Sequence, residues 1–192
     1  MNFSSRALFC VALISLAIPF SGNAARNEFL TYYCPAVNDK YEGGPLTMLG
    51  SKVVTLEESG RTGILPTAAS WLNFAGKCNN HYKTSRSAPR CVVQIKIAGI
   101  RTLPGYRNHV AKFKSKYPAL CETCDTIVAV VEDTGGPFNR QNKKNPRLMF
   151  DLAMDSRKHC YRGGGFRTDK VDWNIAGYVP GSSRPKYYSK RN

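Results

Sequence analysis

The chain has 192 residues, and its 28 Lys and Arg outnumber its 13 Asp and Glu, so the formal net charge is +15. Beyond the N-terminal segment, no stretch approaches the roughly 18 uninterrupted apolar residues of a membrane-spanning helix, so we expect no stable membrane span. The excess of positive charge favours partners that are polyanions.

The N-terminal segment has the three parts of a secretory signal. Arg6 supplies a positive start, Ala7–Phe20 is apolar but short for a membrane span, and small residues lead up to Ala24. We expect cleavage after Ala24, with Ala25 as the alternative, and a secreted or periplasmic protein. Residues 1–24 are then a signal peptide, and the roughly 165 residues that remain fit one domain better than two.

The cysteines beyond this signal form an even set, which in an exported chain indicates disulfides whose pairing the sequence leaves open. For Cys121-x-x-Cys124 we favour two separate structural bridges over a redox motif or half of a zinc site. There is no second Cys-x-x-Cys pair, so we expect neither a metal nor a cofactor. The expected disulfide cysteines are Cys34, Cys78, Cys91, Cys121, Cys124 and Cys160.

The N-terminal half predicts few regular elements. Glu28–Tyr33 has the aromatic and β-branched content of a strand, and Lys52–Leu56 is a second, shorter strand candidate followed by a polar turn. Leu65–Gly76 fits a short helix with Thr67 as its N-cap. Asn79–Arg90 is polar and basic, so we expect an exposed insertion there.

The C-terminal half predicts more strands. Val92–Ile97 alternates as a half-buried strand does, whereas Ile127–Val131 is almost continuously apolar, so both of its faces should be covered. His109–Tyr117 is a candidate for a small basic helix. Leu148–Leu152 returns to the core, and Trp173–Val179 is the expected closing strand.

Several short strands between Gly and Pro turns, with little helix, predict an all-β barrel. We expect this domain to span residues 25–180, with a basic insertion near residues 77–118. Residues 181–192 are rich in Gly, Ser, Pro, Lys and Tyr, and we expect a flexible basic tail there.

Two acids lie within or at the end of apolar segments. Asp133 ends the most apolar strand and is followed by Thr134 and two glycines, and Asp151 lies inside Leu148–Leu152. Partial burial raises the pKa of a carboxyl, so both are candidates for acid/base catalysis. The alternative for each is structural: Asp133 caps backbone N–H groups in its turn, and Asp151 is a buried acid bonded to backbone or arginine.

Asp133-Thr-Gly-Gly-Pro-Phe, a basic loop and Phe150-Asp151-Leu152 resemble the core of the double-psi β-barrel superfamily. The first motif is similar to the "3D" domain of membrane-bound lytic transglycosylase A and to rare lipoprotein A. Phe-Asp-Leu resembles the general-acid segment of the family 45 endoglucanases, relatives of the expansins. The resemblance covers residues 127–152. It implies a mainly β fold, a six-stranded double-psi β-barrel with short helices and long disulfide-tied loops.

The chain departs from these families in three places. The Ala-His element of rare lipoprotein A has no counterpart. Met149 stands where expansins and family 45 enzymes usually have His. Tyr33 is followed by Cys34-Pro35 rather than by the Asp that serves family 45 enzymes as general base. An inverting mechanism with two separated carboxylates therefore lacks an obvious base.

The resemblance implies that Asp151 is the general acid of a glycan-cleaving enzyme, with Asp133 supporting the site. A lytic transglycosylase step on peptidoglycan needs one such acid, which later takes the proton of the attacking sugar hydroxyl. Because Tyr32 and Tyr33 alternate on a strand, one of them should face the sugar while the other packs inside. The expected substrate-binding residues are Tyr32, Tyr33, Thr134, Lys143, Lys144 and Arg147.

The expected partner is a cell-wall polysaccharide or another anionic polymer. Export disfavours nucleic acid, and we expect a monomer. The main alternative to the enzyme is a non-catalytic module that binds or loosens the wall, similar to expansins or the basic, six-cysteine barwin proteins. A third, less favoured, is a secreted inhibitor or toxin on the same scaffold.

Overall fold

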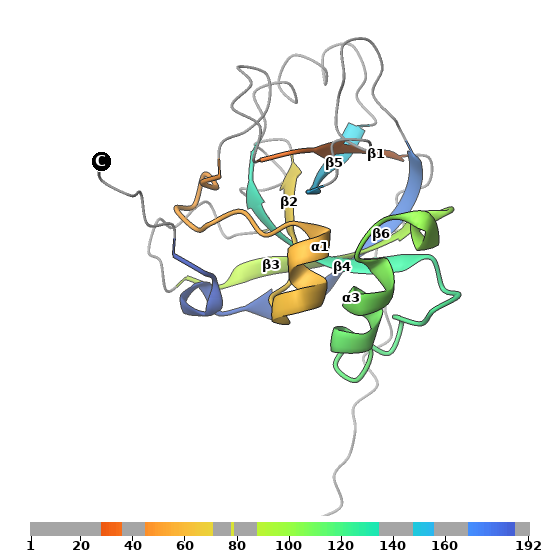
Figure 1. Cartoon of the computed structure of the whole chain (residues 1–192). Coiled ribbons are helices and arrows are strands. Elements are labelled where there is room, and N and C mark those ends of the chain that lie inside the picture. The colour runs from red at the N-terminus through yellow and green to blue at the C-terminus, as the bar shows by residue number, and fades with distance from the viewer. Residues whose placement is uncertain are drawn as a thin grey trace, which may run out of the picture.

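The computed structural model describes residues 28–35, 45–70, 78, 88–134, 148–155 and 169–186. Their six strands form one mixed sheet that closes into a ring, in the order β1-β5-β2-β4-β3-β6, with β6 paired back to β1 (Figure 1). The strands are β1 Glu28–Tyr33, β2 Thr67–Ser70, β3 Arg90–Ile97, β4 Thr126–Asp133, β5 Leu148–Ala153 and β6 Asp169–Val179. The expectation of a mainly β fold is confirmed at this level.

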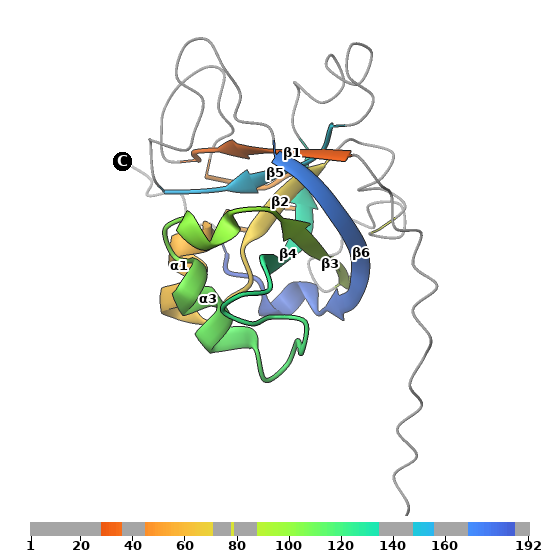
Figure 2. The same ribbon diagram turned by 90° about the vertical axis from the view of Figure 1, so that its right-hand side faces the viewer.

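Two of the strand pairs are parallel, β1 with β5 and β2 with β4, and the other four are antiparallel. The long strand β6 pairs with β3 over most of its length and reaches β1 at its start, so it closes the ring (Figure 2). The predicted strand Trp173–Val179 is therefore the closing one, and it begins four residues earlier than the sequence indicates.

The main core fills the interior of the ring. Alternate residues of β4 point inward, where Ile127, Ala129 and Val131 join Phe150 and the edge of Trp173. The other residues of β4 pack outside the ring in a second cluster, with Leu65, Val92 and Phe113. Both faces of β4 are therefore covered, as its apolar run predicts. Each fully buried side chain of this size contributes about 1.5–3 kcal/mol.

Two short helices lie side by side on the side of the ring away from β1 (Figures 1 and 2). They are α1, Leu56–Thr62, and α3, Tyr106–Phe113. Their backbones approach closely at two glycines: a Cβ on Gly60 would lie 2.6 Å from Asn108 Cβ, and one on Gly105 would lie 2.6 Å from Glu57 Cα. Any other residue at these positions would force the helices apart.

Two predictions in the N-terminal half are wrong. Lys52–Leu56 is no strand: Lys52 makes an isolated bridge, and Leu56 begins α1, which Thr55 caps by accepting the N–H of Glu58. The expected helix from Leu65 contains β2 instead. This strand pairs with β4 on one side and β5 on the other, and pairing on both sides outweighs the weak helical pattern.

The region expected as a basic insertion, residues 77–118, includes β3, a strand of the ring. Arg90, taken as the end of an exposed loop, is only 1% exposed. The strand is buried along most of its length rather than half-buried. The basic helix is confirmed in kind but spans Tyr106–Phe113 rather than His109–Tyr117. Residues 79–87 lie outside the described part of the chain.

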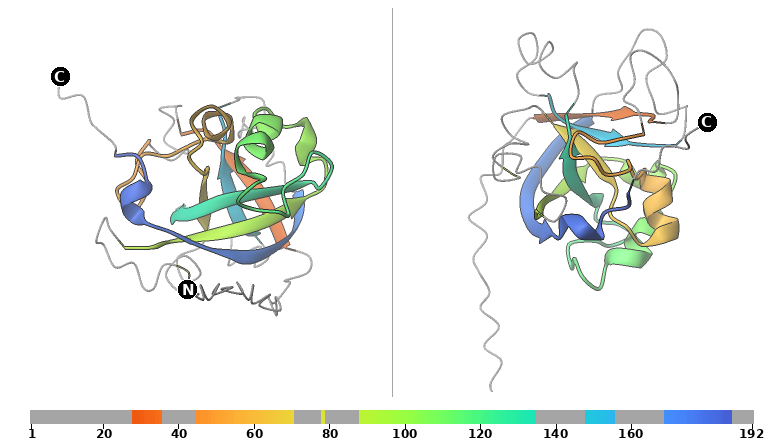
Figure 3. Two further views of the ribbon diagram at one scale, coloured as in Figure 1. Left: turned by 90° about the horizontal axis from the view of Figure 1, so that it is seen from below. Right: turned by 90° about the vertical axis from the view of Figure 1, so that its left-hand side faces the viewer.

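The first residues of the expected tail lie against the ring. Residues 181–183 form a short 3-10 helix, η2, after the end of β6 (Figure 3). Arg184, which follows it, is buried. Lys186 makes a bridge with Ser51. Charge pairing with a buried glutamate, described below, holds this segment in place. Residues 187–192, like the predicted signal peptide, lie outside the described residues.

Two disulfides join described cysteines, Cys78 to Cys91 and Cys121 to Cys124. The second corrects our preference for two separate bridges, because this pair bonds to itself across a tight turn. Cys34 is disulfide-bonded as well. Cys160 is outside the described residues. Such bonds are typical of oxidising compartments. In the described part of the chain, no helix has the length and apolarity needed to cross a membrane.

Candidate functional site

The two candidate carboxylates face the same side of the sheet, on either side of one alanine. Ala69 of β2 is in register with Asp151 of β5 and with Asp133 of β4. Residues in register on neighbouring strands share a face, and strands lie about 4.8 Å apart, so the two aspartate Cα atoms are about 10 Å apart. Ala69 itself places only a methyl group between the two carboxyl groups, and the Tyr33 side chain packs on it.

A β-bulge brings Asp133 onto this face. The register between β2 and β4 shifts so that Ala68 opposes Val131 while Ala69 opposes Asp133, and Glu132 is skipped. Strict alternation would turn Asp133 toward the ring interior, like Val131. The extra residue turns it outward instead, which is the effect that bulges have beside functional sites.

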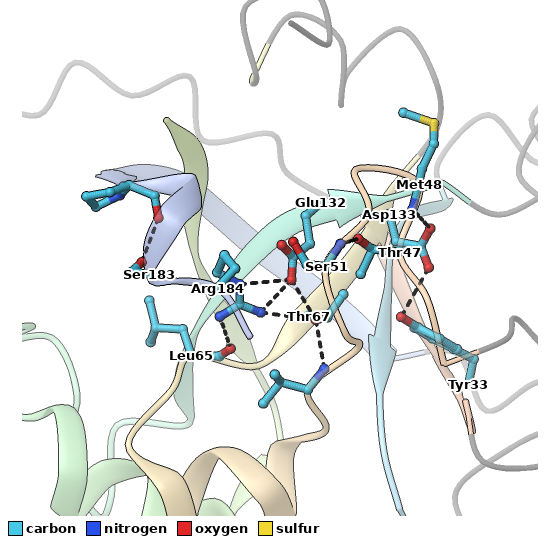
Figure 4. A network of polar contacts seen from close by, with 12 residues as sticks. Tyr33, Thr47, Met48, Ser51, Leu65, Thr67, Glu132, Asp133, Ser183 and Arg184 are labelled. Carbon is cyan, nitrogen blue, oxygen red and sulfur yellow. Dashed lines mark hydrogen bonds and ion pairs between the residues drawn. The ribbon is translucent and has the colours of Figure 1, made fainter. Parts of the chain in front are cut away.

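Asp133 accepts three hydrogen bonds, and Figure 4 shows those from Met48 and Tyr33. The backbone N–H groups of Met48 and Thr134 donate to Oδ1, at 3.0 and 2.9 Å, and the Tyr33 hydroxyl donates to Oδ2 at 3.4 Å. Half-burial nevertheless raises its pKa to about 6, since desolvation outweighs the lowering by the two N–H groups. The expected turn-capping role is thus present, in a carboxyl that titrates near neutral pH.

Tyr33 lies on the same face as the two carboxylates. Its side chain packs with Ala69, Val53 and Ala153, outside the ring. Burial first, and then the negative charges of nearby acids that include Asp133 and Asp151, raise the pKa of Tyr33 well above its usual range. Its hydroxyl therefore stays protonated and acts as a donor at any ordinary pH.

The two adjacent tyrosines separate as alternation predicts. Tyr32 packs in the interior core and is 4% exposed, so it faces away from the carboxylates and is not available to a substrate there. Tyr33 is on the site face but is itself only 7% exposed, so the structure shows it as a donor to Asp133 and not as an open surface for a sugar. Thr134 is half-buried at the edge of the site, with its hydroxyl 3.0 Å from the Met48 sulfur. The expected cationic contacts Lys143, Lys144 and Arg147 lie outside the described residues.

Sequence reasoning missed the polar network directly behind Asp133. Glu132 is 1% exposed, and its Oε1 accepts from Arg184 Nε at 3.0 Å and from the Thr67 hydroxyl at 2.9 Å (Figure 4). Arg184 also donates to the Leu65 carbonyl at 2.7 Å. An acid inside an otherwise apolar strand was the available signal, because buried acids are almost always paired.

Arg90 is a second buried cation near this network. Burial lowers the pKa of its guanidinium, and the charge of Glu132 partly offsets that effect. Its Nη1 donates to the Ala88 carbonyl at 3.1 Å. Arg90 and Arg184 belong to two regions that we expected to be exposed, and both are thus structural.

Met48 is the other unexpected neighbour of the site. It is 41% exposed and lies in a turn that also donates the Leu49 N–H to the Glu132 carbonyl. Nothing in its local sequence indicates this position, because residues 45–52 approach β4 only in the folded chain. Within the described residues, no group of His, Cys, Asp and Glu side chains could hold a metal ion.

His109 is another buried titratable group, and it lies between α3 and β4, away from the two aspartates. Its Nε2 accepts the Val128 N–H at 3.3 Å, so its Nδ1 carries the proton and donates to the Ser59 hydroxyl at 3.2 Å. Burial lowers its pKa to about 4. Both ring nitrogens are satisfied in the neutral form, so this histidine is structural.

The candidate site is therefore a pair of carboxylates on one outer face of a six-stranded ring, one of them titrating near neutral pH. Comparison with protein-family models, curated proteins and solved structures found no match for this chain.

Proposed function

We propose that the protein is secreted and cleaves a cell-wall polysaccharide, such as peptidoglycan, at the face that holds Asp133 and Asp151. One observation carries the proposal: both carboxylates flank Ala69 in register, and half-burial raises the pKa of Asp133 to about 6. A carboxyl with such a pKa can both give and take a proton near neutral pH. We also infer that the ring is the double-psi β-barrel that the sequence motifs resemble.

In this proposal Asp133, rather than Asp151, is the proton donor. Protonated Asp133 gives its proton to the glycosidic oxygen as the C1–O bond breaks. In a lytic transglycosylase step the carboxylate then takes the proton of the sugar C6 hydroxyl as its oxygen bonds to C1, so no water is consumed. Asp151 stabilises the positive charge that develops at C1 from the other side of Ala69.

The spacing also allows hydrolysis with inversion. Carboxyl groups of inverting glycosidases are about 6.5–9.5 Å apart, which is compatible with Cα atoms separated by two strand spacings. In that case Asp151 activates the water and Asp133 protonates the leaving oxygen. Hydrolysis adds one water to the products, whereas the transglycosylase step adds none, so product masses separate the two reactions.

The test uses purified mature protein, Asp133→Asn and Asp151→Asn, each incubated with peptidoglycan, cellulose and chitin. We expect soluble fragments from the wild type, with rates reduced at least about a hundredfold in Asp133→Asn. Thr62→Ala, an exposed change in α1, serves as the control. Equal product release by wild type and Asp133→Asn would overturn the assignment of Asp133.

A second candidate function is a non-catalytic module that binds or loosens the wall. It is favoured by the fact that Asp133 already accepts two backbone N–H groups and a hydroxyl, as a purely structural acid would. If none of the polymers yields products but the wild type is retained on one of them, this second function is the correct one.

A further inference from the structure

The solvent face of α3 carries a row of cations. Arg107, Ala111 and Lys114 are exposed at spacings of four and three residues, so they form one stripe along the helix. Arg107 and Lys114 are about 10 Å apart along the axis. Lys116, also exposed, follows two residues after Lys114, past the end of the helix. We name Arg107, Lys114 and Lys116 the basic row; the alanine between them leaves the helix open to close approach.

The charge of this row is not balanced locally. The helix contains no acid, and within the described residues none of the three cations forms an ion pair. Nearby acids are engaged elsewhere: Asp125 pairs with Arg101 at 3.0 Å, and Glu58 pairs with Lys52 at 2.6 Å. The exposed Glu122 follows in the turn after the helix.

Helix stability does not explain Arg107. It lies in the first turn, where the positive end of the helix dipole repels a cation and an acid would be favoured. The positive charge of Arg107 therefore does not stabilise the helix, whereas it would strengthen the binding of a polyanion that lies along the helix.

The basic row ends at a pocket of about 200 Å³. Its walls include Leu65, Phe113 and Val179, and Tyr117 and Lys116 lie at its edge. The Lys116 ammonium is 5.5 Å from the centre of the Tyr117 ring. Pockets for drug-sized ligands are about 300–1,000 Å³, so this one has room for a single ring-sized group. Apolar and aromatic walls beside a cation suit the face of a sugar ring that carries a negative group.

Two other polyanionic partners fit less well. Membrane binding needs a helix with a free apolar face, but the apolar residues of α3, Tyr106, Val110 and Phe113, are buried against the ring. Nucleic acid is disfavoured because the disulfides are typical of an oxidising compartment. An extracellular acidic polysaccharide needs no free apolar helix face and is found in an oxidising compartment, so neither objection applies to it.

We propose that the basic row and its pocket bind a carboxylated or sulfated polysaccharide, with one sugar ring in the pocket beside Tyr117. This surface is on the side of the ring away from β1, so it is a second site, apart from Asp133 and Asp151 (Figures 1 and 2). This second site rests on the proposed function only for the choice of a polysaccharide as the ligand. The binding measurement described next does not depend on Asp133 or Asp151.

The experiment measures binding of the full mature protein to polygalacturonate, which is carboxylated, and to heparin, which is sulfated, over a range of salt concentrations. The test variant is Arg107→Gln/Lys114→Gln/Lys116→Gln. The matched control, Lys96→Gln/Lys170→Gln/Lys186→Gln, removes the same charge from exposed positions on β3, on β6 and after η2. Circular dichroism checks that both variants fold.

We expect the test variant to lose at least about tenfold in affinity, and the salt slope to fall by about one for each cation removed. The control should stay within about twofold. The polymer whose affinity falls more, polygalacturonate or heparin, identifies whether the site prefers a carboxylate or a sulfate. Tyr117→Ala should weaken binding without changing the salt slope.

Equal losses in the two triple variants, or no loss in either, would overturn the basic row as a site. If polyaspartate or duplex DNA bound as tightly as both polysaccharides, the assignment of a polysaccharide as the ligand would be overturned. Asp133→Asn should bind like the wild type, so failure of the proposed cleavage leaves this result unaffected.

Discussion

Two adjacent acids of β4 lie in opposite electrostatic settings. Glu132 is fully buried and its carboxylate is bonded to the guanidinium of Arg184. Asp133 is half-buried and, among the described residues, has hydrogen-bond donors but no cation partner. The first arrangement anchors the segment after η2 to the ring. The second leaves a carboxyl whose pKa is raised to about 6. A paired buried acid builds structure, and an unneutralised one can exchange a proton.

The largest expected effect comes from removing the cation. Arg184→Met leaves the Glu132 carboxylate buried without its partner, and we expect a loss of about 3–5 kcal/mol in the free energy of unfolding. Urea denaturation measures it. In Glu132→Gln/Arg184→Met, most of this loss should disappear, since neither charge of this pair is left. A loss below about 1 kcal/mol in the single variant would mean that Arg90 or water neutralises Glu132.

Asp133 should respond to pH with the sign opposite to that of a salt-bridged acid. Its folded pKa of about 6 lies above the usual value of 3.8, so its favourable contribution is full below pH 3.8 and is lost as pH rises through 6. We expect Asp133→Asn to gain about 2 kcal/mol relative to the wild type between pH 4 and pH 7, after allowing for partial exposure.

That comparison is made as variant minus wild type at each pH because His109 acts in the other direction. Its pKa of about 4 lies below 6.5, so the stability that it contributes is present above pH 6.5 and is lost as pH falls toward 4. Since His109 is the same in both proteins, its effect cancels. A difference that stays constant with pH would refute the raised pKa of Asp133.

Thr67 links the Glu132–Arg184 ion pair to the rest of the fold. Its hydroxyl donates to Glu132, and it accepts from Val54 N–H at 3.0 Å and from Arg184 Nη2 at 3.2 Å. Thr67→Val keeps the shape but leaves those donors without an acceptor, so we expect a loss of about 1–2 kcal/mol in thermal or urea unfolding. Thr62→Ala, at an exposed helix end, should change the stability little. Equal stability losses in the two variants would show that the hydrogen bonds of Thr67 do not support the ion pair.

The smallest effect is expected at Tyr33. Tyr33→Phe removes a long hydrogen bond of 3.4 Å to Asp133, so the stability change should stay below about 1 kcal/mol. That bond favours the charged carboxylate, so the pKa of Asp133 should rise further above 6. Carbon-13 NMR titration of the aspartate carboxyls measures the shift. A lowered pKa would contradict the assigned direction of the hydrogen bond.

The sequence by itself determined the elements whose pattern is local. The continuous apolar run of β4 and the aromatic strand β1 were predictable because side-chain periodicity reports burial directly. The same reasoning found Asp133 and Asp151, since an acid within or at the end of an apolar strand is unusual wherever it occurs. It also separated Tyr32 from Tyr33, because neighbouring residues on a strand face opposite sides.

Tertiary structure alone decided how these pieces meet. β2 is four residues long and becomes a strand only because β4 and β5 flank it, so its own sequence favoured a helix. The bulge at Glu132 depends on the register between two distant strands, and without it Asp133 would face the interior. Arg184 looked like part of a loose tail because its partner is 52 residues away in the chain. Local sequence records what each segment can bury, whereas the register, the bulge and the ion pair arise from contacts between segments that only the closed ring brings together.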